Sequence, residues 1–417
     1  MTTNFNTDEL EAPEWMNNTF FERALRSYEH DNDVSVKNFT TQPATKVGDH
    51  FASIMFRVVI EYDSPKYKKY GEKLQVIVKS MPVTKSQKSD FLEQIPAFKT
   101  EIKMYTKVIP EMERVLSSVG DATIIGPRLI FATFDPIPVL VLEDISVTGY
   151  EMVEKPIDYE GAKLVAHRIA KFHAASIYIQ ANGMDLTCFN ETLMTVKMPE
   201  LGGTMLDTFM VPTFDLLVDV MKTWHGDWEN IIQKLEKCKL TFADKVRNVY
   251  LGKNERIFSV LNHSDFHYKN MMFIKEDGIV KDLLLLDFQF CLWGTCAIDL
   301  SYLFYMISNA SARERRMDLL QYYYDEFEST LKKLGYSGRI PTLHDFNIEI
   351  LRNGIVEVLL CVSMLMFQYM DFSNMTTEEV WDTKDPFALH RITMKNPEYQ
   401  KALKKELPRL VALGLIE

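Results

Sequence analysis

Apolar and polar residues alternate along much of the first half of the chain, which is the period-two pattern of half-buried β-strands. In the clearest case, residues 53–62, large apolar side chains fall on one face while Arg57 and Glu61 fall on the other. A lysine-rich run with a proline and a glycine follows, as expected of an exposed hairpin connection. The strands predicted in this half are 53–62, 74–80, 128–134 and 139–143.

One helix interrupts this β-rich half, and helices dominate the rest of the chain. Apolar residues recur at helical spacing over 97–109, where Pro110 is expected to end the helix. Beyond about residue 145 the periodicity predicts helices at 159–180, 301–334 and 347–370, with short strands at 270–274 and 283–288. This order of elements predicts a small lobe, built of a sheet and one helix, joined to a larger helical lobe. A cleft between two lobes commonly holds a ligand.

The composition excludes several classes of protein. Of the 417 residues, 47% are apolar and 25% are charged, so the chain is neither mostly disordered nor collagen-like nor a disulfide scaffold. Acidic residues (58) outnumber basic ones (47), which gives a formal net charge of −11. Because proteins that bind polyanions carry an excess of positive charge, nucleic acid is not expected as a partner.

The cysteines and the apolar segments indicate the cytoplasm. Five scattered cysteines without a C-x-x-C pair are typical of free thiols in a reducing compartment. The first 15 residues are acidic and polar, unlike a secretory signal. The most apolar late stretch, residues 354–370, carries Glu357 and Gln368 and is short for a membrane span, so we expect a buried helix there. We therefore predict a cytoplasmic protein with no membrane partner.

The strongest candidate for chemistry is the segment LNHSDFHYKNMMF with the segment LLLLDFQF that follows it. The first places His263, Asp265 and Asn270 in an H-x-D-x-x-x-x-N array, and the second places Asp287 22 residues after Asp265. An acidic turn with a glycine at 276–278 can return the chain so that Asn270 and Asp287 meet. Phosphoryl transfer uses one carboxylate for the attacking hydroxyl, and an amide oxygen with a second carboxylate for Mg²⁺. Taken alone, each aspartate is better explained as a turn or cap residue.

Seven motifs in a fixed order carry a family resemblance. Between residues 42 and 305 the chain contains QPATKVGDHFASIMFRV, VIVKSMP, FKTEIKMY, VLVLEDI, AKFHAAS, NHSDFHYKNMMF, and LDFQ followed by IDLSYLF. In this order they resemble the protein-kinase-like superfamily of choline kinases and aminoglycoside phosphotransferases, and more closely the insect ecdysteroid-kinase-like family. The resemblance implies a bilobal, protein-kinase-like α+β fold, with a small antiparallel-sheet lobe and a large, mainly helical lobe. It also implies ATP-dependent phosphorylation of a small molecule, with ATP and Mg²⁺ as cofactors. The expected domains are an N-terminal extension (1–40), a nucleotide-binding lobe (41–143) and a helical lobe with the catalytic loop and acceptor pocket (144–417).

The resemblance assigns several residues to the nucleotide. Lys79 matches the strand lysine that contacts the α- and β-phosphates, and Glu101 matches the helix glutamate that pairs with it. Outside such a motif, both residue types are usually solvated. Gly48 and Ser53 resemble the loop that covers the nucleotide, although this loop lacks G-x-G-x-x-G and Ser53 is equally well explained as a strand-start serine.

Further residues match the hinge between the lobes and the catalytic loop. Glu143 and Ile145 match the hinge, where backbone groups recognise adenine. The resemblance gives Asp265 the task of positioning and deprotonating the acceptor hydroxyl, with His263 bracing the loop. Asp299 matches a residue that supports that loop, although a helix N-cap explains it equally well. The ligands implied for Mg²⁺ are Asn270 and Asp287.

Two departures from the family pattern concern the catalytic segments. Residue 264 is Ser where family members usually carry Gly, which puts a side chain beside the expected base. Asp287 is followed by Phe288 and Gln289 rather than by Phe-Gly, as expected of small-molecule kinases, so a flipping activation segment is not implied. His167 and His173 lie on one predicted helix without a partnering acidic motif, and zinc is not expected there.

The acceptor is the least determined part of the prediction. The resemblance points to a steroid (an ecdysteroid) or a xenobiotic alcohol, and a choline- or aminoglycoside-type kinase or a non-catalytic binding protein are the alternatives. A segment rich in methionine and aromatic residues, 205–228, is explained first by core packing and second as a wall of an apolar acceptor pocket. A monomer is expected.

Overall fold

The computed structural model describes residues 11–44, 53–81, 95–197, 202–370 and 387–417. The chain forms two compact units, which are described one at a time. The first consists of Met1–Glu111, Ile124–Glu151 and Leu284–Gln289, and the second of Met112–Thr123, Met152–Leu283 and Phe290–Glu417.

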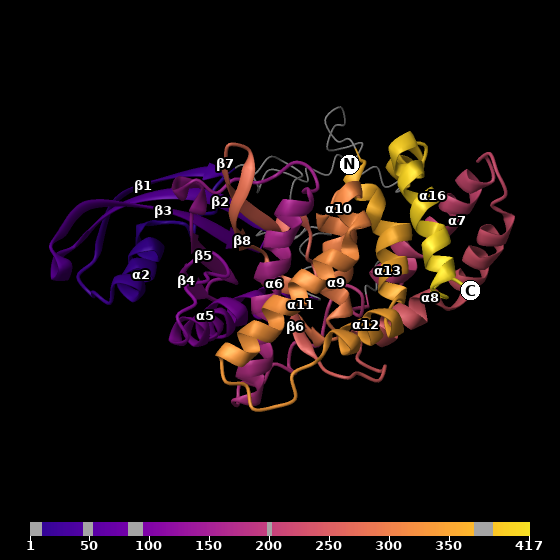
Figure 1. Cartoon of the computed structure of the whole chain (residues 1–417). Helices are drawn as coiled ribbons and strands as arrows, with labels where there is room; N and C mark the ends of the chain where they lie inside the picture. The colour runs from indigo at the N-terminus through magenta and orange to yellow at the C-terminus, as the bar shows by residue number, and fades with distance from the viewer. Residues whose placement is uncertain (1–10, 45–52, 82–94, 198–201, 371–386) are drawn as a thin grey trace. The chain divides into compact units, whose positions relative to one another are not determined.

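The first unit is built on a five-stranded antiparallel sheet (Figure 1). The four strands predicted in the first half of the chain are all present, and a fifth forms one edge. In spatial order the strands are β1 (Ser35–Pro43), β2 (Ile54–Ser64), β3 (Lys69–Ser80), β5 (Val139–Glu143) and β4 (Leu129–Thr133). The expected hairpin connection is a short 3₁₀ turn, Pro65–Tyr67, between β2 and β3.

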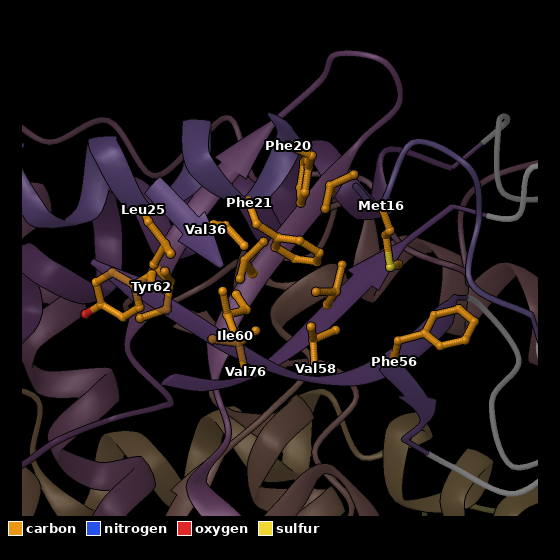
Figure 2. Packing of buried hydrophobic residues seen from close by; sticks show 14 of the residues in the cluster. Met16, Phe20, Phe21, Leu25, Val36, Phe56, Val58, Ile60, Tyr62 and Val76 are labelled. Carbon is orange, nitrogen blue, oxygen red and sulfur yellow. The ribbon is translucent and has the colours of Figure 1, made fainter. Parts of the chain in front are cut away.

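Helix α2 (Asn18–Glu29) covers one face of this sheet, and neither α2 nor β1 is predicted by the pattern. Figure 2 shows Phe20, Phe21 and Leu25 of the helix packed on side chains of β1, β2 and β3. The sheet contributes the apolar face of β2 that the alternation predicts, because every second residue from Ile54 to Tyr62 is buried. The expected N-terminal extension thus contains a helix and most of a strand that belong to the first unit.

The other face of the sheet carries Lys79 on β3.

The helix predicted over 97–109 is present as α4 (Ala97–Lys103), but its expected end at Pro110 is wrong. The chain continues through a π-turn, Met104–Val108, into α5 (Ile109–Ser118). Proline lacks an N–H and crowds the turn before it, and the wider π-turn accommodates both effects.

The second unit is mainly helical, and its long helix α6 packs against α11 (Figure 1). Two small antiparallel sheets accompany the helices: β6 (Val260–Asn262) with β9 (Leu292–Gly294), and β7 (Met271–Glu276) with β8 (Ile279–Leu285). The helices are α6 (Tyr159–Ala181), α7 (Pro212–Met221), α8 (Glu229–Tyr250), α9 (Ala297–Tyr302), α10 (Ala310–Glu314), α11 (Arg316–Lys333), α12 (Leu343–Arg352), α13 (Ile355–Leu359), α15 (Ala388–Thr393) and α16 (Pro397–Ala412).

Two helices that the periodicity predicts as continuous are broken. The segment 301–334 is interrupted after a π-turn, Leu303–Ile307, where Ser308 is extended and the side chain of Asn309 caps α10. The segment 347–370 is divided at residues 353–354, between α12 and α13, and its last part consists of π and 3₁₀ turns. Within the described ranges, no single helix is long and apolar enough to cross a membrane, although the bent pair Leu343–Arg352 and Ile355–Gln368 meets that test by length and composition.

Candidate active site

A buried ion cluster forms at the face of the first unit's sheet that lies opposite α2. Strand β3 supplies Lys79, helix α4 supplies Glu101, and the segment after β8 supplies Asp287. The Lys79 Nζ lies 2.7 Å from Glu101 Oε2 and also contacts Asp287 Oδ1. Lys79 is only 4% exposed and Glu101 1%, so this cation and the two carboxylates balance one another with little help from water.

The electrostatics of the cluster are set by burial and by its unequal charges. Burial alone lowers the pKa of Lys79, but the two carboxylates, Asp287 above all, outweigh it and raise this pKa. Burial raises the pKa of Glu101 to about 7, and Asp287 adds to the rise while Lys79 opposes it. Lys79 therefore remains an ammonium ion, which is the form that can neutralise phosphate oxygens.

Asp287 is held in an unusual backbone conformation by its neighbours. Its φ is +64°, in the left-handed region that L-residues seldom adopt. Gln289 Nε2 donates to Asp287 Oδ2 at 3.1 Å, and the Phe288 N–H donates to Glu101. The Phe288 ring meets the Tyr105 ring edge to face, with 5.4 Å between centroids. Gln289 thus helps to fix the Asp287 carboxylate in a way that the sequence did not predict.

Gly126 allows this segment to approach the sheet closely. A Cβ on that glycine would lie 2.9 Å from the Leu285 carbonyl oxygen and 3.0 Å from the Phe288 ring. The Leu285 N–H also donates to the Ile125 carbonyl at 2.9 Å. The chain just before Asp287 is therefore anchored by backbone contacts that tolerate no side chain at residue 126.

In the second unit, Asp299 organises the loop that follows β6. Its two carboxylate oxygens accept from the backbone N–H of His263 at 2.6 Å and of Ser264 at 2.9 Å. Asp299 is in the first turn of α9 but does not cap it, since the N-cap residue is Cys296. The loop-supporting reading of Asp299 therefore agrees with these contacts better than the helix-cap reading.

The carboxylate of Asp299 has a second buried partner that the sequence analysis did not identify. His173 Nε2 lies 3.1 Å from Asp299 Oδ2, and His173 Nδ1 lies 2.7 Å from the Tyr323 hydroxyl. All three side chains are buried completely. His173 belongs to the AKFHAAS motif, which the sequence singled out. Its position on a helix does not show which distant carboxylate it contacts.

Asp265 is partly exposed and is tied to the residue predicted to bind metal. Asn270 Nδ2 donates to the Asp265 backbone carbonyl at 2.9 Å and to Asp265 Oδ2 at 3.0 Å. His267 Nε2 lies 3.5 Å from the other carboxylate oxygen. With its NH₂ group engaged in this way, Asn270 has its amide oxygen left as a possible cation ligand.

Asp265 also lines a cavity of about 80 Å³, which lies within the second unit. The cavity is lined by four methionines (Met194, Met205, Met210, Met364), by Thr192, Leu193, Tyr250, Ser264, Phe290 and Tyr302, and by Asp265. From the predicted segment 205–228 it takes Met205 and Met210, whereas Phe214 and Met221 are buried in the core, so this segment contributes both to the cavity wall and to the core.

The remaining predicted residues are less informative. Gly48 lies outside the described residues, and Ser53 is buried just before β2. The Glu143 side chain accepts from the Arg128 N–H at 2.9 Å, which leaves the hinge role to its backbone. Ile145 begins a 3₁₀ turn capped by Asp144, whose carboxylate also accepts from Arg57 and Gln75.

The predicted residues therefore fall into two groups. Lys79, Glu101 and Asp287 lie together in the first unit. The second unit brings together the catalytic-loop residues His263, Asp265, Asn270 and Asp299. Among the residues that the structure describes, no group of three or more His, Cys, Asp or Glu side chains is placed to bind a metal ion.

A strand lysine paired with a helix glutamate on an antiparallel sheet, together with an Asp–Asn loop in a helical unit, defines the protein-kinase-like class of small-molecule phosphotransferases. The α+β fold predicted from the sequence is confirmed. A family model for the ecdysteroid kinase-like family matches residues 47–336, well over half of the chain, and the chain belongs to this family. The resemblance stated from the motifs is therefore confirmed as well.

The solved structures that the chain matches are remote in sequence. A choline kinase from Cryptosporidium parvum Iowa II is 11% identical, with 95% of this chain and 96% of that chain covered and a TM-score of 0.41. A Plasmodium vivax ethanolamine kinase is 12% identical (88% and 84% covered, TM-score 0.34), as is a macrolide 2'-phosphotransferase from Brachybacterium faecium (82% and 97% covered, TM-score 0.33). No curated protein matches the chain significantly. Similarities this distant do not identify the acceptor.

Proposed function

We propose that this protein transfers the γ-phosphoryl group of ATP to a hydroxyl group on a small, largely apolar molecule, with a steroid or xenobiotic alcohol as the first candidate. The observation that carries the proposal is the position of Asp265. Among the described residues that line the cavity in the second unit, Asp265 is the one charged side chain, and methionines supply much of the wall. An apolar alcohol suits these walls, and its hydroxyl group would find a carboxylate that can accept its proton.

The first unit would hold the nucleotide. Lys79, kept charged by Glu101 and Asp287, would bind the α- and β-phosphates, while the backbone of Glu143 and Ile145 would receive the adenine. Gly48 and Ser53 would lie over the phosphates. Mg²⁺, when bound, neutralises charge on the phosphates during transfer. Its protein ligands would be Asp287 and the amide oxygen of Asn270, a set of hard oxygen donors of the kind that this ion prefers.

The second unit would hold the acceptor and remove its proton. Asp265 would accept the hydrogen bond of the attacking hydroxyl and take its proton as the oxygen–phosphorus bond forms and ADP leaves. Asn270 orients that carboxylate through the 3.0 Å hydrogen bond. His263, completely buried, would brace the loop, and Asp299 would hold the loop backbone.

The alternatives make different demands on the cavity. A choline- or aminoglycoside-type acceptor is cationic and needs several acidic groups or an aromatic cage around it. The described lining offers one carboxylate, one phenylalanine and two tyrosines, which favours an uncharged acceptor. A binding protein without catalysis would take up the same ligand but would transfer no phosphate.

The proposal is tested by a mass-spectrometric screen of the purified protein with MgATP. The panel contains ecdysteroids, plant steroids, choline and aminoglycosides, and the product sought is heavier by one phosphoryl group. Asp265→Asn should abolish that product, with a loss of at least about 10³-fold in rate. The matched control is Asp277→Asn, the same change at an exposed turn between β7 and β8, which should retain activity.

The outcomes of the screen separate the candidate functions. Phosphorylated choline or aminoglycoside with no steroid product would replace the proposed acceptor by the cationic one. Binding of a panel member without any phosphorylated product would favour the non-catalytic alternative. Activity that survives in Asp265→Asn would reject Asp265 as the base.

We also propose that the protein works as a cytoplasmic monomer, with no nucleic-acid or membrane partner. All five cysteines are free thiols, and four of them are buried. Thiols persist in this form in a reducing compartment. Size-exclusion chromatography with light scattering tests the monomer, and fractionation of the source cells tests the compartment.

A further inference from the structure

Ser264 carries a side chain at a position whose backbone favours glycine. Its φ is +66°, in the left-handed region where a Cβ is unfavourable. The conformation is imposed by Asp299, which accepts hydrogen bonds from the N–H of both His263 and Ser264. Glycine would meet these backbone demands without strain. The serine side chain is therefore not explained by the fold of the loop.

The hydroxyl of Ser264 is buried and has no hydrogen-bond partner among the described residues. Ser264 is only 6% exposed, and its Oγ is shielded from solvent. A buried hydroxyl without a partner is unfavourable, and native proteins seldom leave one in that state. Two other polar groups of the cavity are engaged: Thr192 Oγ1 accepts from the Met194 N–H, and the Tyr302 hydroxyl contacts Met364 Sδ. The Tyr250 hydroxyl, which also lines the cavity, is buried without a hydrogen-bond partner among the described residues, as that of Ser264 is.

Ser264 lines the same cavity as Asp265, its neighbour in the chain. We propose that the Ser264 hydroxyl binds a second oxygen of the acceptor, next to the hydroxyl that Asp265 activates, so that the protein selects apolar 1,2-diols or α-hydroxyketones over simple alcohols. This inference rests on the proposed function for the identity of the cavity as the acceptor site. A hydroxyl can donate to a ketone or accept from a second hydroxyl, so both acceptor types are served.

The remaining lining supports an apolar body for this acceptor. Four methionines, Leu193 and Phe290 surround the polar pair, and methionine side chains adapt to irregular ligands. Ser264 and Asp265 would fix the orientation of the reacting edge while these walls accept different frameworks. Ser264 would thus be a specificity-determining residue, whereas Asp265 would do the chemistry.

The test uses two probes that differ by one hydroxyl: 1-phenylethane-1,2-diol and 2-phenylethanol. Dissociation constants come from ligand-observed NMR without ATP, and kcat/KM from mass spectrometry of the phosphorylated product. We expect the wild-type protein to prefer the diol by about 3- to 10-fold, which is the value of one hydrogen bond. Ser264→Ala keeps the Cβ and removes the hydroxyl, so this variant should bind and phosphorylate the diol and the simple alcohol about equally well. Asp277→Gly, at a positive-φ residue of the β7–β8 turn, is the control and should keep the wild-type preference.

Each outcome assigns success or failure to one idea. Equal preference in the wild-type protein and in Ser264→Ala, or failure of the wild-type protein to bind the diol, overturns the role of Ser264. A diol preference in binding that depends on Ser264, but without phosphate transfer, supports this inference and rejects the proposed function. A Ser264-dependent preference in both measurements supports the two together.

Discussion

Lys79 and Asp287 contact each other directly although 208 residues separate them in the chain. The contact joins the third strand of the first unit's sheet to the segment that follows β8, and Lys79 also forms an ion pair with Glu101 of α4. Lys79 and Glu101 are buried and Asp287 is partly exposed, and charges withdrawn from water in this way are costly unless they are balanced. The cluster is therefore a stability element as well as the proposed phosphate site, and the two roles can be separated by mutation.

Replacing Lys79 by methionine should impair both roles. Glu101 and Asp287 would lose their shared ammonium partner, and breaking a buried pair costs on the order of 3–5 kcal/mol of unfolding free energy. ATP turnover should fall by about 10²–10³-fold, because the phosphates lose a fixed positive charge. Urea denaturation and single-turnover kinetics measure the two effects.

Lys73→Met is the matched control, since Lys73 is an exposed residue of the same strand. It should leave both quantities close to those of the wild-type protein. Full activity in Lys79→Met would remove Lys79 from the proposed nucleotide site, whatever its effect on stability.

The raised pKa of Glu101 predicts how stability depends on pH. Burial, with Asp287 adding, raises the pKa of Glu101 to about 7 from its ordinary value of 4.5, so between these pH values the folded protein binds more protons than the unfolded chain. This group's contribution to stability is therefore fully present below pH 4.5 and declines as the pH rises to about 7. The decline has a slope of at most about 1.4 kcal/mol per pH unit.

Glu101→Gln removes this titration. The unfolding free energy of the variant, measured by urea denaturation from pH 5 to pH 8, should fall less steeply with pH than that of the wild-type protein. Parallel curves for the two proteins would show that Glu101 does not titrate in this window.

The extent to which the sequence predicted the fold depended on where each element is buried. Alternation predicted β2 because its apolar face packs on α2, whereas β1 is an edge strand with mostly exposed residues and shows no such period. The break at Ser308 was invisible because distant contacts fix it: the Ile157 N–H donates to the Ile307 carbonyl, and the Asn309 N–H donates to the Ile157 carbonyl.

The candidate site, like the fold, could be predicted from the sequence only in part. Local motifs were sufficient to select Lys79, Glu101 and Asp265, because each belongs to a short run with a recognisable order. The partners of the carboxylates beside them were not predictable, since His173 meets Asp299 across 126 residues and the Gln289 side chain donates to Asp287. The positive φ of Ser264 is likewise set by hydrogen bonds to Asp299 and not by its neighbours in the sequence.

Removing the Asp299 carboxylate should disable the loop that carries Asp265. Asp299→Ala leaves the N–H groups of His263 and Ser264 and the ring of His173 without their acceptor, at a cost of about 1–3 kcal/mol for each buried group left unsatisfied. We expect a fall in kcat larger than the change in KM for ATP, because the carboxylate positions the loop and does not bind the nucleotide.

The control for Asp299 is Asp282→Ala. Asp282 forms an ion pair with Arg168, but its side chain is 43% exposed. Exposed ion pairs contribute roughly 0–1 kcal/mol, so this variant should be nearly as stable as the wild-type protein. If the two alanine variants lost the same stability and the same activity, Asp299 would have no special role in the loop.

Ser264→Gly should make the protein more stable while it impairs the selection of diols. Glycine adopts φ +66° freely, whereas an L-residue in this region costs roughly 1–2 kcal/mol. Part of the gain is offset because glycine also makes the unfolded chain more flexible, so we expect a net increase of about 0.5–1 kcal/mol in unfolding free energy. Ser264→Ala keeps the Cβ and should gain no such relief of backbone strain, which separates the strain from the hydroxyl. Thermal denaturation of the three proteins measures this, and a melting temperature of Ser264→Gly at or below that of Ser264→Ala would show that the backbone at this residue is not strained.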